Sequence, residues 1–445
     1  MSSKNKKNPQ KPSQEGPSNP TPPPGEQPTQ PKANKPIIVD IHTHMYPPSY
    51  IDLLQSRTTI PLLRSFPGHP SPRLVLLPSE LPLLSHPSPS HPPGRPLTES
   101  YTSLDAKIAF MDKHSISISV LSLANPWLDF FSTSPDTTTT TTTTSPDTIN
   151  AAAIKINTEF ELMCQTHPNR LYFFAVLPLH PTTTTNLTNL TEIVSSLTTS
   201  TFPHCRGIIL GTNGLGLGLD DPALDPLFHL LQDLALPIFL HPHYGLPNQV
   251  FGPRAERGEY GHVLALALGF PMETAVAVGR MYLSGVFDRF PRLKIILAHG
   301  GGALPVLAGR VESCLRCDGF LYKMEKEGKG GRMERSMGEV LRSQVFLDAV
   351  VYSEVGLRAA IGAGGEGGVG RLMFGTDHPF FPPLGEGEGE GEGEGEGEGQ
   401  WGSVVVNREA VDGVLGEGSE EAGMVLGGNA IRILNLREEE GGEES

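Results

Sequence analysis

The sequence is poor in cysteine and has no apolar stretch long enough to span a membrane. Four cysteines in 445 residues are too few for the disulfide framework of a small secreted domain. Cys314 and Cys317 form one CxxC pair without a second pair or a nearby histidine, so they fit neighbouring helix residues better than a zinc site. The most apolar run, 263–270, is cut short by Pro271 and Glu273. Since the N-terminus also lacks the apolar core of a signal peptide, we expect a cytosolic protein with no membrane partner.

Positive charge is also scarce. The chain has 34 Lys and Arg against 49 Asp and Glu, a formal net charge of −15. Most of the excess lies in the Gly-Glu alternation at 385–399 and in the last eight residues, so the rest is only mildly acidic. No basic patch or Arg-rich helix is present, which argues against nucleic acid as a partner.

Glycine and proline, in contrast, are abundant, at 50 and 42 residues, and much of that excess lies in low-complexity tracts. Such tracts have too little apolar surface to pack. We expect a disordered Pro- and Lys-rich tail at 1–35, low-complexity loops at 132–148 and 385–399, and an acidic tail at 437–445. Residues 36–436 remain as one large folded domain.

Short apolar or β-branched runs recur along this domain and alternate with stretches of helical spacing. Several are apolar at every position, as expected for strands covered on both faces. The predicted strands are 36–41, 116–123, 171–177, 206–210, 237–240, 293–297, 345–347 and 372–374. Eight strands alternating with helices predict a (β/α)₈ TIM barrel, with the Pro-rich segment 45–104 as an insertion over its mouth. A doubly wound sheet is the alternative, but His-Thr-His rather than a Gly-rich phosphate turn follows the first strand.

Residue types that bind metals directly follow four of the predicted strands. In strand order they are His42 and His44, His241, His299, and Asp377. Side chains at the carboxyl ends of barrel strands converge on one site, and zinc takes His and carboxylate ligands around an open position. Two histidines at i and i+2 of an extended segment also point to the same side. The pattern predicts a metal site, whereas each histidine alone could be an ordinary loop or core residue.

Longer runs around these residues resemble the amidohydrolase superfamily, and within it the branch of aminocarboxymuconate-semialdehyde, γ-resorcylate and isoorotate decarboxylases. The runs are VDIHTHMYPPSY at 39–50, LANPW at 123–127, FLHPHYGLPN at 239–248, GHVLALALGFPMET at 261–274 and MFGTDHPFFPP at 373–383. The resemblance implies a metal-dependent, non-oxidative carboxy-lyase (decarboxylase). Its substrate would be a small planar aromatic or pyrimidine carboxylate, with uracil-5-carboxylate as the expected compound.

The resemblance also implies the metal ligands and their number. They fall on His42, His44, His241 and Asp377. Binuclear members bridge two ions with a carboxylated lysine after the fourth strand, whereas this strand ends in Leu-Gly-Thr-Asn. We therefore expect one ion, Zn²⁺ or Mn²⁺, and, from the resemblance, a homodimer or dimer-based oligomer. Asp348, at the end of the seventh strand, could hydrogen-bond a ligand, and Asp40 could support the histidine pair from below.

Five residues have implied roles toward the substrate. Asp377 is the candidate proton donor to the ring carbon that loses CO₂, and His299 would hold a substrate oxygen. Arg95 would bind an anionic or carbonyl oxygen in a forked geometry. Asn125 and Phe380 match positions that line the substrate pocket, and Phe380 would lie against a flat ring.

Two other functions stay open on the sequence. The same ligands would serve a mononuclear hydrolase of a lactone or amide, with Asp377 as the base for the attacking water. The second is a non-catalytic barrel whose low-complexity tracts bind partners, although the full ligand set argues against it. The Asn-Pro-Trp run, together with Arg95 and Phe380, favours the lyase.

Overall fold

The computed structural model describes residues 37–76, 80–85, 93–128, 146–179, 187–214, 217–320, 333–383, 399 and 401–436. The tails predicted at 1–35 and 437–445 lie outside these residues, as does nearly all of the two predicted low-complexity loops. Residues 146–148, which the sequence placed in the first of these loops, form the start of helix α5 (Pro146–Thr166).

Eight parallel strands form the central sheet, in the order β1-β5-β6-β7-β8-β9-β10-β11. They are β1 (Val39–Met45), β5 (Ile118–Leu123), β6 (Leu171–Val176), β7 (Cys205–Gly211), β8 (Ile238–His241), β9 (Ile295–Leu297), β10 (Val345–Asp348) and β11 (Leu372–Met373). The sheet closes on itself nearly completely, because the backbone N–H of Ile41 donates to the carbonyl oxygen of Phe374 at 3.1 Å. Each predicted strand overlaps one of these strands, so the predicted (β/α)₈ TIM barrel is confirmed.

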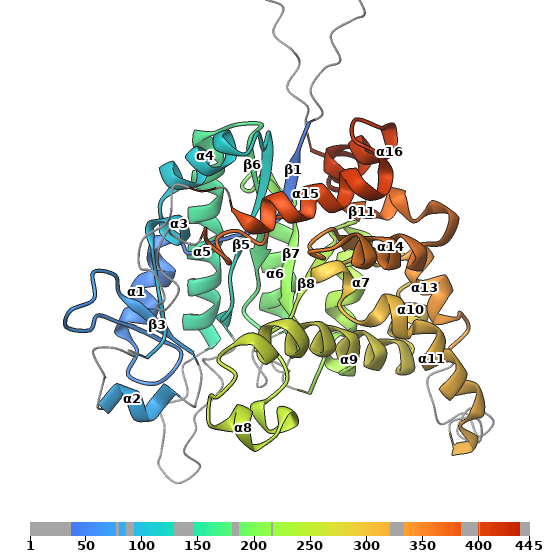
Figure 1. Cartoon of the computed structure of the whole chain (residues 1–445), viewed down its shortest axis with the longest axis horizontal. Coiled ribbons are helices and arrows are strands. Elements are labelled where there is room, and N and C mark those ends of the chain that lie inside the picture. The colour runs from blue at the N-terminus through green and yellow to red at the C-terminus, as the bar shows by residue number, and fades with distance from the viewer. Residues whose placement is uncertain are drawn as a thin grey trace, which may run out of the picture. The chain divides into compact units, whose positions relative to one another are not determined.

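Helices surround the strands (Figure 1). Besides α5, those of the described residues are α1 (Pro48–Ser56), α2 (Leu81–Ser85), α3 (Glu99–Thr102), α4 (Leu104–Lys113), α6 (Leu187–Ser196), α7 (Asp225–Asp233), α8 (Pro253–Glu256), α9 (Phe270–Leu283), α10 (Val286–Arg289), α11 (Leu304–Cys317), α13 (Met337–Ser343), α14 (Glu354–Ala363), α15 (Gly402–Leu415), α16 (Glu420–Gly423) and α17 (Asn429–Leu434). Every residue of β5 and β6 is buried, because helices cover the outer face and side chains fill the barrel. Among the described residues, no helix is both long and apolar enough to cross a lipid bilayer.

The predicted insertion between the first two barrel strands contains a small antiparallel sheet. Its strands are β2 (Leu62–Arg64), β3 (Arg73–Val75) and β4 (Arg95–Pro96). Leu62, Phe66 and Val75 form a separate apolar cluster there. The buried Arg73 guanidinium ties β3 to the next strand, because its Nε donates to the carbonyl oxygens of Pro93 and Gly94 at 3.1 Å. The sheet therefore gives Arg95 a fixed support.

Candidate metal centre

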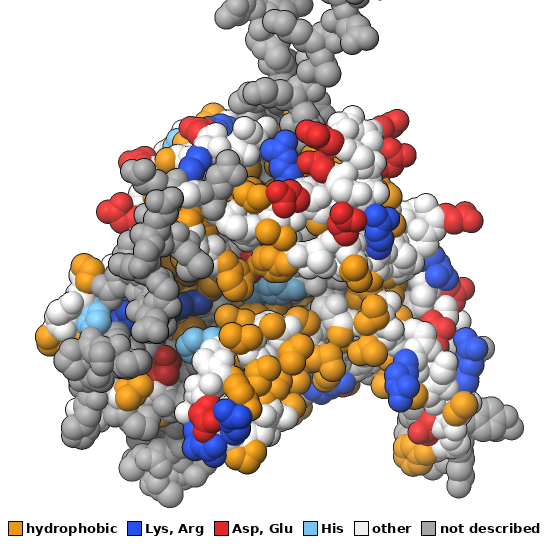
Figure 2. Space-filling view, in the orientation of Figure 1, with side chains coloured by type: hydrophobic (Ala, Val, Ile, Leu, Met, Phe, Trp, Pro, Cys, Tyr) orange, Lys and Arg blue, Asp and Glu red, His pale blue; other side chains and the backbone are white. Residues whose placement is uncertain are grey.

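Side chains from four strand ends meet at the carboxyl end of the barrel. They are His42 and His44 of β1, His241 of β8, His299 after β9, and Asp377 after β11. One candidate ligand atom from each of His42, His241, His299 and Asp377 lies within 4.8 Å of the others. His44 adjoins this group, because its Nε2 lies 3.6 Å from Asp377 Oδ1. The structure thus brings together every residue that the sequence associated with a metal, and histidine atoms are visible in the middle of the face in Figure 2.

Three of the histidines are oriented by a contact at Nδ1. The partners are Asp348 Oδ2 for His42 (2.6 Å), Ser122 Oγ for His44 (2.9 Å) and the carbonyl oxygen of Pro242 for His241 (2.8 Å). With Nδ1 engaged, the Nε2 atom of each ring is left for the centre. His299 differs, because its buried Nδ1 has no hydrogen-bond partner and its side chain is 15 % exposed. Three of the imidazoles are therefore fixed by a hydrogen bond, whereas the His299 ring is not and is partly exposed to solvent.

The residues present fit a divalent cation. The Nε2 atoms of His42 and His44 are buried and have no hydrogen-bond partner, and an unsatisfied buried polar atom is costly and rare. A cation among these nitrogens and the Asp377 carboxylate would satisfy both. Imidazole nitrogen with carboxylate oxygen is a donor set that suits zinc and manganese.

The charge states also suit a metal centre. Burial lowers the pKa of His44 to about 4 and that of His241 well below its usual value, so both are neutral, as ligands must be. Burial also disfavours a charged His42, but Asp377 and Asp348 outweigh it and raise the pKa of His42 to about 10. Without an ion His42 therefore keeps its proton, and a cation bound at Nε2 would displace it. Burial raises the pKa of Asp377, yet the positive charge of His42 and the nearby rings of His299 and His44 bring it well below its usual value. The centre therefore offers an ionised carboxylate.

The buried Asp348 carboxylate contacts both His42 of β1 and the backbone of the segment that carries His299. Besides His42 Nδ1, it accepts the backbone N–H of His299 at 3.0 Å, of Gly300 at 2.8 Å and of Val350 at 3.1 Å. Burial opposes its charge, but the hydrogen bond from His42 brings the pKa of Asp348 below its usual value. The expectation that Asp348 hydrogen-bonds a candidate ligand agrees with this geometry.

Replacing Asp348 by Asn should weaken metal binding by roughly 10- to 100-fold, the usual effect of losing such an outer partner. Four N–H groups point at the two carboxylate oxygens, and an amide would turn its own NH₂ toward some of them. Titration of Mn²⁺ followed by electron paramagnetic resonance measures the change. Asp225→Asn, which breaks only an exposed ion pair with Arg289, serves as the control. An unchanged Mn²⁺ affinity in Asp348→Asn would contradict this role.

A buried lysine that the sequence did not single out lies beneath the centre. Lys107 Nζ is 2.5 Å from Thr43 Oγ1, between the β1 histidines, and 2.5 Å from His378 Nδ1, next to Asp377. Its helix α4 is capped by Ser103, whose side chain accepts the backbone N–H of Ala106. Asp40, as expected, supports the histidine pair, since it accepts the backbone N–H of His42 at 3.2 Å. On the sequence Lys107 resembles any lysine of an amphipathic helix, so no local signal marks it.

Arg95 and Phe380 lie together at one side of the centre. The Arg95 guanidinium carbon is 4.5 Å from the Phe380 ring centroid, and the Phe380 ring is 5.7 Å from that of His44. Arg95 Nη2 donates to Tyr46 Oη at 3.4 Å, while the buried Nε has no partner. No described carboxylate forms an ion pair with Arg95, so its charge remains available to an anion.

Asn125 lies farther from the centre and ties two loops together. Its Nδ2 donates to the carbonyl oxygen of His243 at 2.5 Å, and its own carbonyl oxygen accepts the Tyr46 hydroxyl at 2.7 Å. Asn125 therefore supports the Tyr46 hydroxyl that Arg95 contacts, and its place in the substrate pocket stays a prediction.

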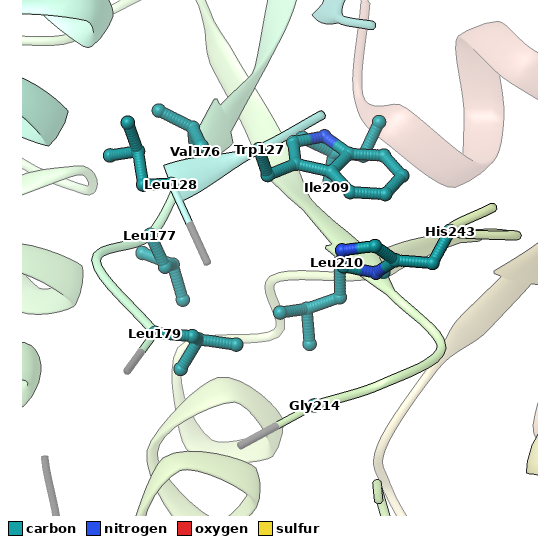
Figure 3. A pocket seen from close by; sticks show the side chains of 10 residues that line it. Trp127, Leu128, Val176, Leu177, Leu179, Ile209, Leu210, Gly214 and His243 are labelled. Atoms are coloured by element: carbon teal, nitrogen blue, oxygen red, sulfur yellow. The ribbon is translucent and has the colours of Figure 1, made fainter. Parts of the chain in front are cut away.

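The end of β7 has no room for a side chain. Figure 3 shows Trp127 and His243 beside the small, mostly apolar cavity at this strand end. A Cβ atom at Gly211 would lie 2.1 Å from His243 Nδ1 and 2.8 Å from Trp127 Cζ3. A lysine at this position would displace both rings, so the last residue of β7 cannot carry a bridging ligand for a second ion.

Gly211→Ala should lower the free energy of unfolding by roughly 1–3 kcal/mol, the usual effect of overpacking a filled core. Thermal or urea unfolding measures it. The control is Gly279→Ala on α9, where a new Cβ meets nothing within 4 Å. That variant should be neutral or slightly stabilising, because alanine favours a helix. Equal stability of the two variants would show that His243 and Trp127 do not need this space.

Known proteins share this fold. The amidohydrolase family model Amidohydro_2 matches residues 39–436. The apo crystal structure of IDCase from Metarhizium anisopliae is 54% identical, covers 91% of this chain and 98% of its own, and has a TM-score of 0.79. A 5-carboxyvanillate decarboxylase from Novosphingobium aromaticivorans, solved with manganese and 4-hydroxy-3-methoxy-5-nitrobenzoic acid, has a TM-score of 0.63 at 18% identity, covering 90% of this chain and 97% of that one.

A curated relative matches part of the barrel. The 2-amino-3-carboxymuconate-6-semialdehyde decarboxylase of Dictyostelium discoideum is 28% identical over 230 residues, which are 52% of this chain and 53% of that protein. The match thus spans about half the length of this relative. The family model, in contrast, covers the whole barrel and its metal centre. The resemblance expected from the sequence is therefore confirmed, and the chain belongs to the amidohydrolase family.

Proposed function

We propose that the protein is a metal-dependent, non-oxidative carboxy-lyase that removes CO₂ from uracil-5-carboxylate. The observation that carries this proposal is the half-buried Arg95, held over the Phe380 ring at 4.5 Å beside a histidine–aspartate cluster. The positive Arg95 guanidinium, the flat Phe380 ring and the candidate metal centre lie side by side. This arrangement suits a small planar carboxylate. The 54% identity to IDCase, an isoorotate decarboxylase, supports uracil-5-carboxylate, another name for isoorotate, as that acid.

His42, His44, His241 and Asp377 would hold one divalent ion, and the relative with bound manganese supports Mn²⁺ beside Zn²⁺. When bound, the ion supplies Lewis acidity toward the substrate carboxylate and the neighbouring carbonyl oxygen on the ring. We assign His299 to the substrate rather than to the ion, because its ring is partly exposed and lacks the Nδ1 contact that fixes the other three.

The chain's own residues then bind the substrate and move a proton. Arg95 pairs with an anionic oxygen of the substrate, Phe380 supports the ring face, and His299 holds a carbonyl oxygen on the ring. Protonated Asp377 gives its proton to the ring carbon that bears the carboxylate. The bond from that carbon to the carboxylate breaks, its electron pair returns to the ring, CO₂ leaves, and Asp377 takes a new proton from solvent. Because the histidines hold the pKa of Asp377 low, it must gain its proton once the substrate's charge is bound.

A homodimer in the cytosol is the expected assembly and location. Exposed apolar side chains gather over α9 and the preceding π-helix turn, where Figure 2 shows them in orange. They include Leu268, Met272, Val276 and Leu283, which are 51%, 39%, 55% and 41% exposed. A second copy of the chain would remove this apolar surface from water.

The proposed function is tested by CO₂ release from a panel of acids that includes uracil-5-carboxylate and 2,6-dihydroxybenzoate, with metal content measured alongside. We expect turnover of uracil-5-carboxylate and one ion per chain. Brisk hydrolysis of a lactone with no CO₂ from any planar acid would establish the hydrolase instead. A protein without stoichiometric metal would support the non-catalytic alternative.

A further inference from the structure

The barrel closes at a seam between β1 and the turn that follows β11. Thr43 and His378 form an isolated parallel bridge across this seam. The backbone N–H of His44 donates to the carbonyl oxygen of His378 at 2.8 Å, and the backbone N–H of Asp377 donates to the carbonyl oxygen of the β1 residue His42 at 2.7 Å. Thr43 lies between two candidate ligands, and His378 directly follows a third. The position of Asp377 relative to the β1 histidines is therefore set at this seam.

The side chain of Lys107 enters the seam from helix α4. Its Nζ atom lies 2.5 Å from Thr43 Oγ1 and 2.5 Å from His378 Nδ1. Thr43 Oγ1 in turn donates to the carbonyl oxygen of His378 at 3.2 Å. These three contacts form a closed triangle, so neither side of the seam can move without stretching a hydrogen bond.

Lys107 is completely buried, which is rare for a lysine unless its N–H groups have acceptors. Burial lowers the pKa of Lys107 to about 7, although the Asp40 carboxylate favours the charged form. Both forms can make the two contacts, because the neutral amine keeps two N–H donors. Burial and the charge of Lys107 keep the pKa of His378 well below its usual value, so the ring is neutral and Nδ1 can accept. The contacts of Lys107 therefore do not depend on which form is present.

Helix α4 also packs against His378 through an aromatic ring. The centroid of Phe110 lies 3.7 Å from that of His378, and Lys107 Nζ lies 5.2 Å from the Phe110 ring. This packing does not need the amine of Lys107. We therefore expect the loss of the amine to loosen the seam rather than to unfold the barrel.

We propose that Lys107 is a positioning residue that ties the turn after β11 to β1 and thereby places the Asp377 carboxylate against the β1 histidines. The consequence for metal binding needs only the candidate metal centre. The consequence for turnover rests on the proposed function.

The test uses Lys107→Met, which keeps an unbranched apolar side chain beside Phe110 and removes the N–H donors. We expect the Mn²⁺ dissociation constant to rise and the kcat for uracil-5-carboxylate to fall, each by roughly tenfold, the lower end for an outer partner of a metal ligand. KM should stay within about twofold, because the proposed substrate contacts of Arg95 and Phe380 remain. The electron paramagnetic resonance spectrum of bound Mn²⁺ should also change its zero-field splitting, since the Asp377 carboxylate is held less firmly.

The matched control is Lys113→Met on the same helix. Lys113 is exposed, and its Nζ donates to the carbonyl oxygen of Gly399 at 2.8 Å, so this variant should change none of these quantities. If Lys107 served only the stability of the fold, Lys107→Met would alter the free energy of unfolding and leave the Mn²⁺ affinity and spectrum unchanged. Wild-type Mn²⁺ affinity in folded Lys107→Met would therefore overturn the proposal.

A second variant, Thr43→Val, removes the acceptor on β1 and covers the case in which Lys107→Met does not fold. Valine has nearly the same shape and suits a strand. Thr43→Val should weaken Mn²⁺ binding in the same direction, and unchanged affinity would contradict the proposal. In the double variant the loss should be smaller than the product of the two single losses, because both changes remove one contact; losses that multiply would also overturn it. If the wild type releases no CO₂ from any acid while Lys107→Met still weakens Mn²⁺ binding, the proposed function fails and the positioning role stands.

Discussion

Asp377→Asn should lower the rate of CO₂ release from uracil-5-carboxylate by at least about a hundredfold, the usual contribution of a positioned general acid. The amide keeps nearly the shape of the carboxylate, which lies 3.3 Å from His42 Nε2 and 3.6 Å from His299 Nε2. It cannot carry the proton that must reach the ring carbon. Steady-state CO₂ release by the purified, metal-loaded variant measures the effect.

Metal content has to be measured on the same Asp377→Asn sample, because Asp377 is also a proposed ligand. A variant that keeps its ion and loses turnover separates the proton donor from the ligand role. Asp225→Asn on the outer surface should behave as the wild type. If the metal-loaded Asp377→Asn protein retains most of its activity, Asp377 is not the proton donor.

Removal of the metal by a chelator should also abolish turnover, again by at least about a hundredfold, since a Lewis acid supplies several kcal/mol of transition-state stabilisation. Adding back Mn²⁺ or Zn²⁺ should restore it at one ion per chain, because the described residues form one histidine–aspartate cluster. Atomic absorption on the reloaded protein gives the stoichiometry. Two ions per chain, or full activity after chelation, would contradict the mononuclear centre.

The barrel could be predicted from the sequence because its signals are local. Strands such as β5 and β6 are buried at every position and therefore appear as continuous apolar runs. His241 ends β8 and Asp377 follows β11, whereas His42 lies inside β1, which continues to Met45 instead of ending at the predicted residue 41. The carboxyl halves of parallel strands still meet at one face of a barrel. Their convergence followed from topology alone.

The supporting residues could not be predicted in the same way, because their contacts join distant parts of the chain. Lys107 reaches His378 across 271 residues, and Asp348 reaches His42 across 306. Arg95 was expected near the substrate, but its stacking on Phe380 required the separate sheet of the insertion.

The most direct test of a decarboxylase that protonates a ring carbon is the reaction of the wild type with uracil-5-carboxylate in D₂O. We expect uracil carrying deuterium at C5, the carbon that lost CO₂, because the new proton comes from an exchangeable group on Asp377. Proton NMR of the product shows this as loss of the C5 hydrogen signal, and uracil incubated without enzyme provides the control. Unchanged uracil-5-carboxylate, with a metal-loaded and folded protein, would contradict the proposed decarboxylase. Only the candidate metal centre would then stand.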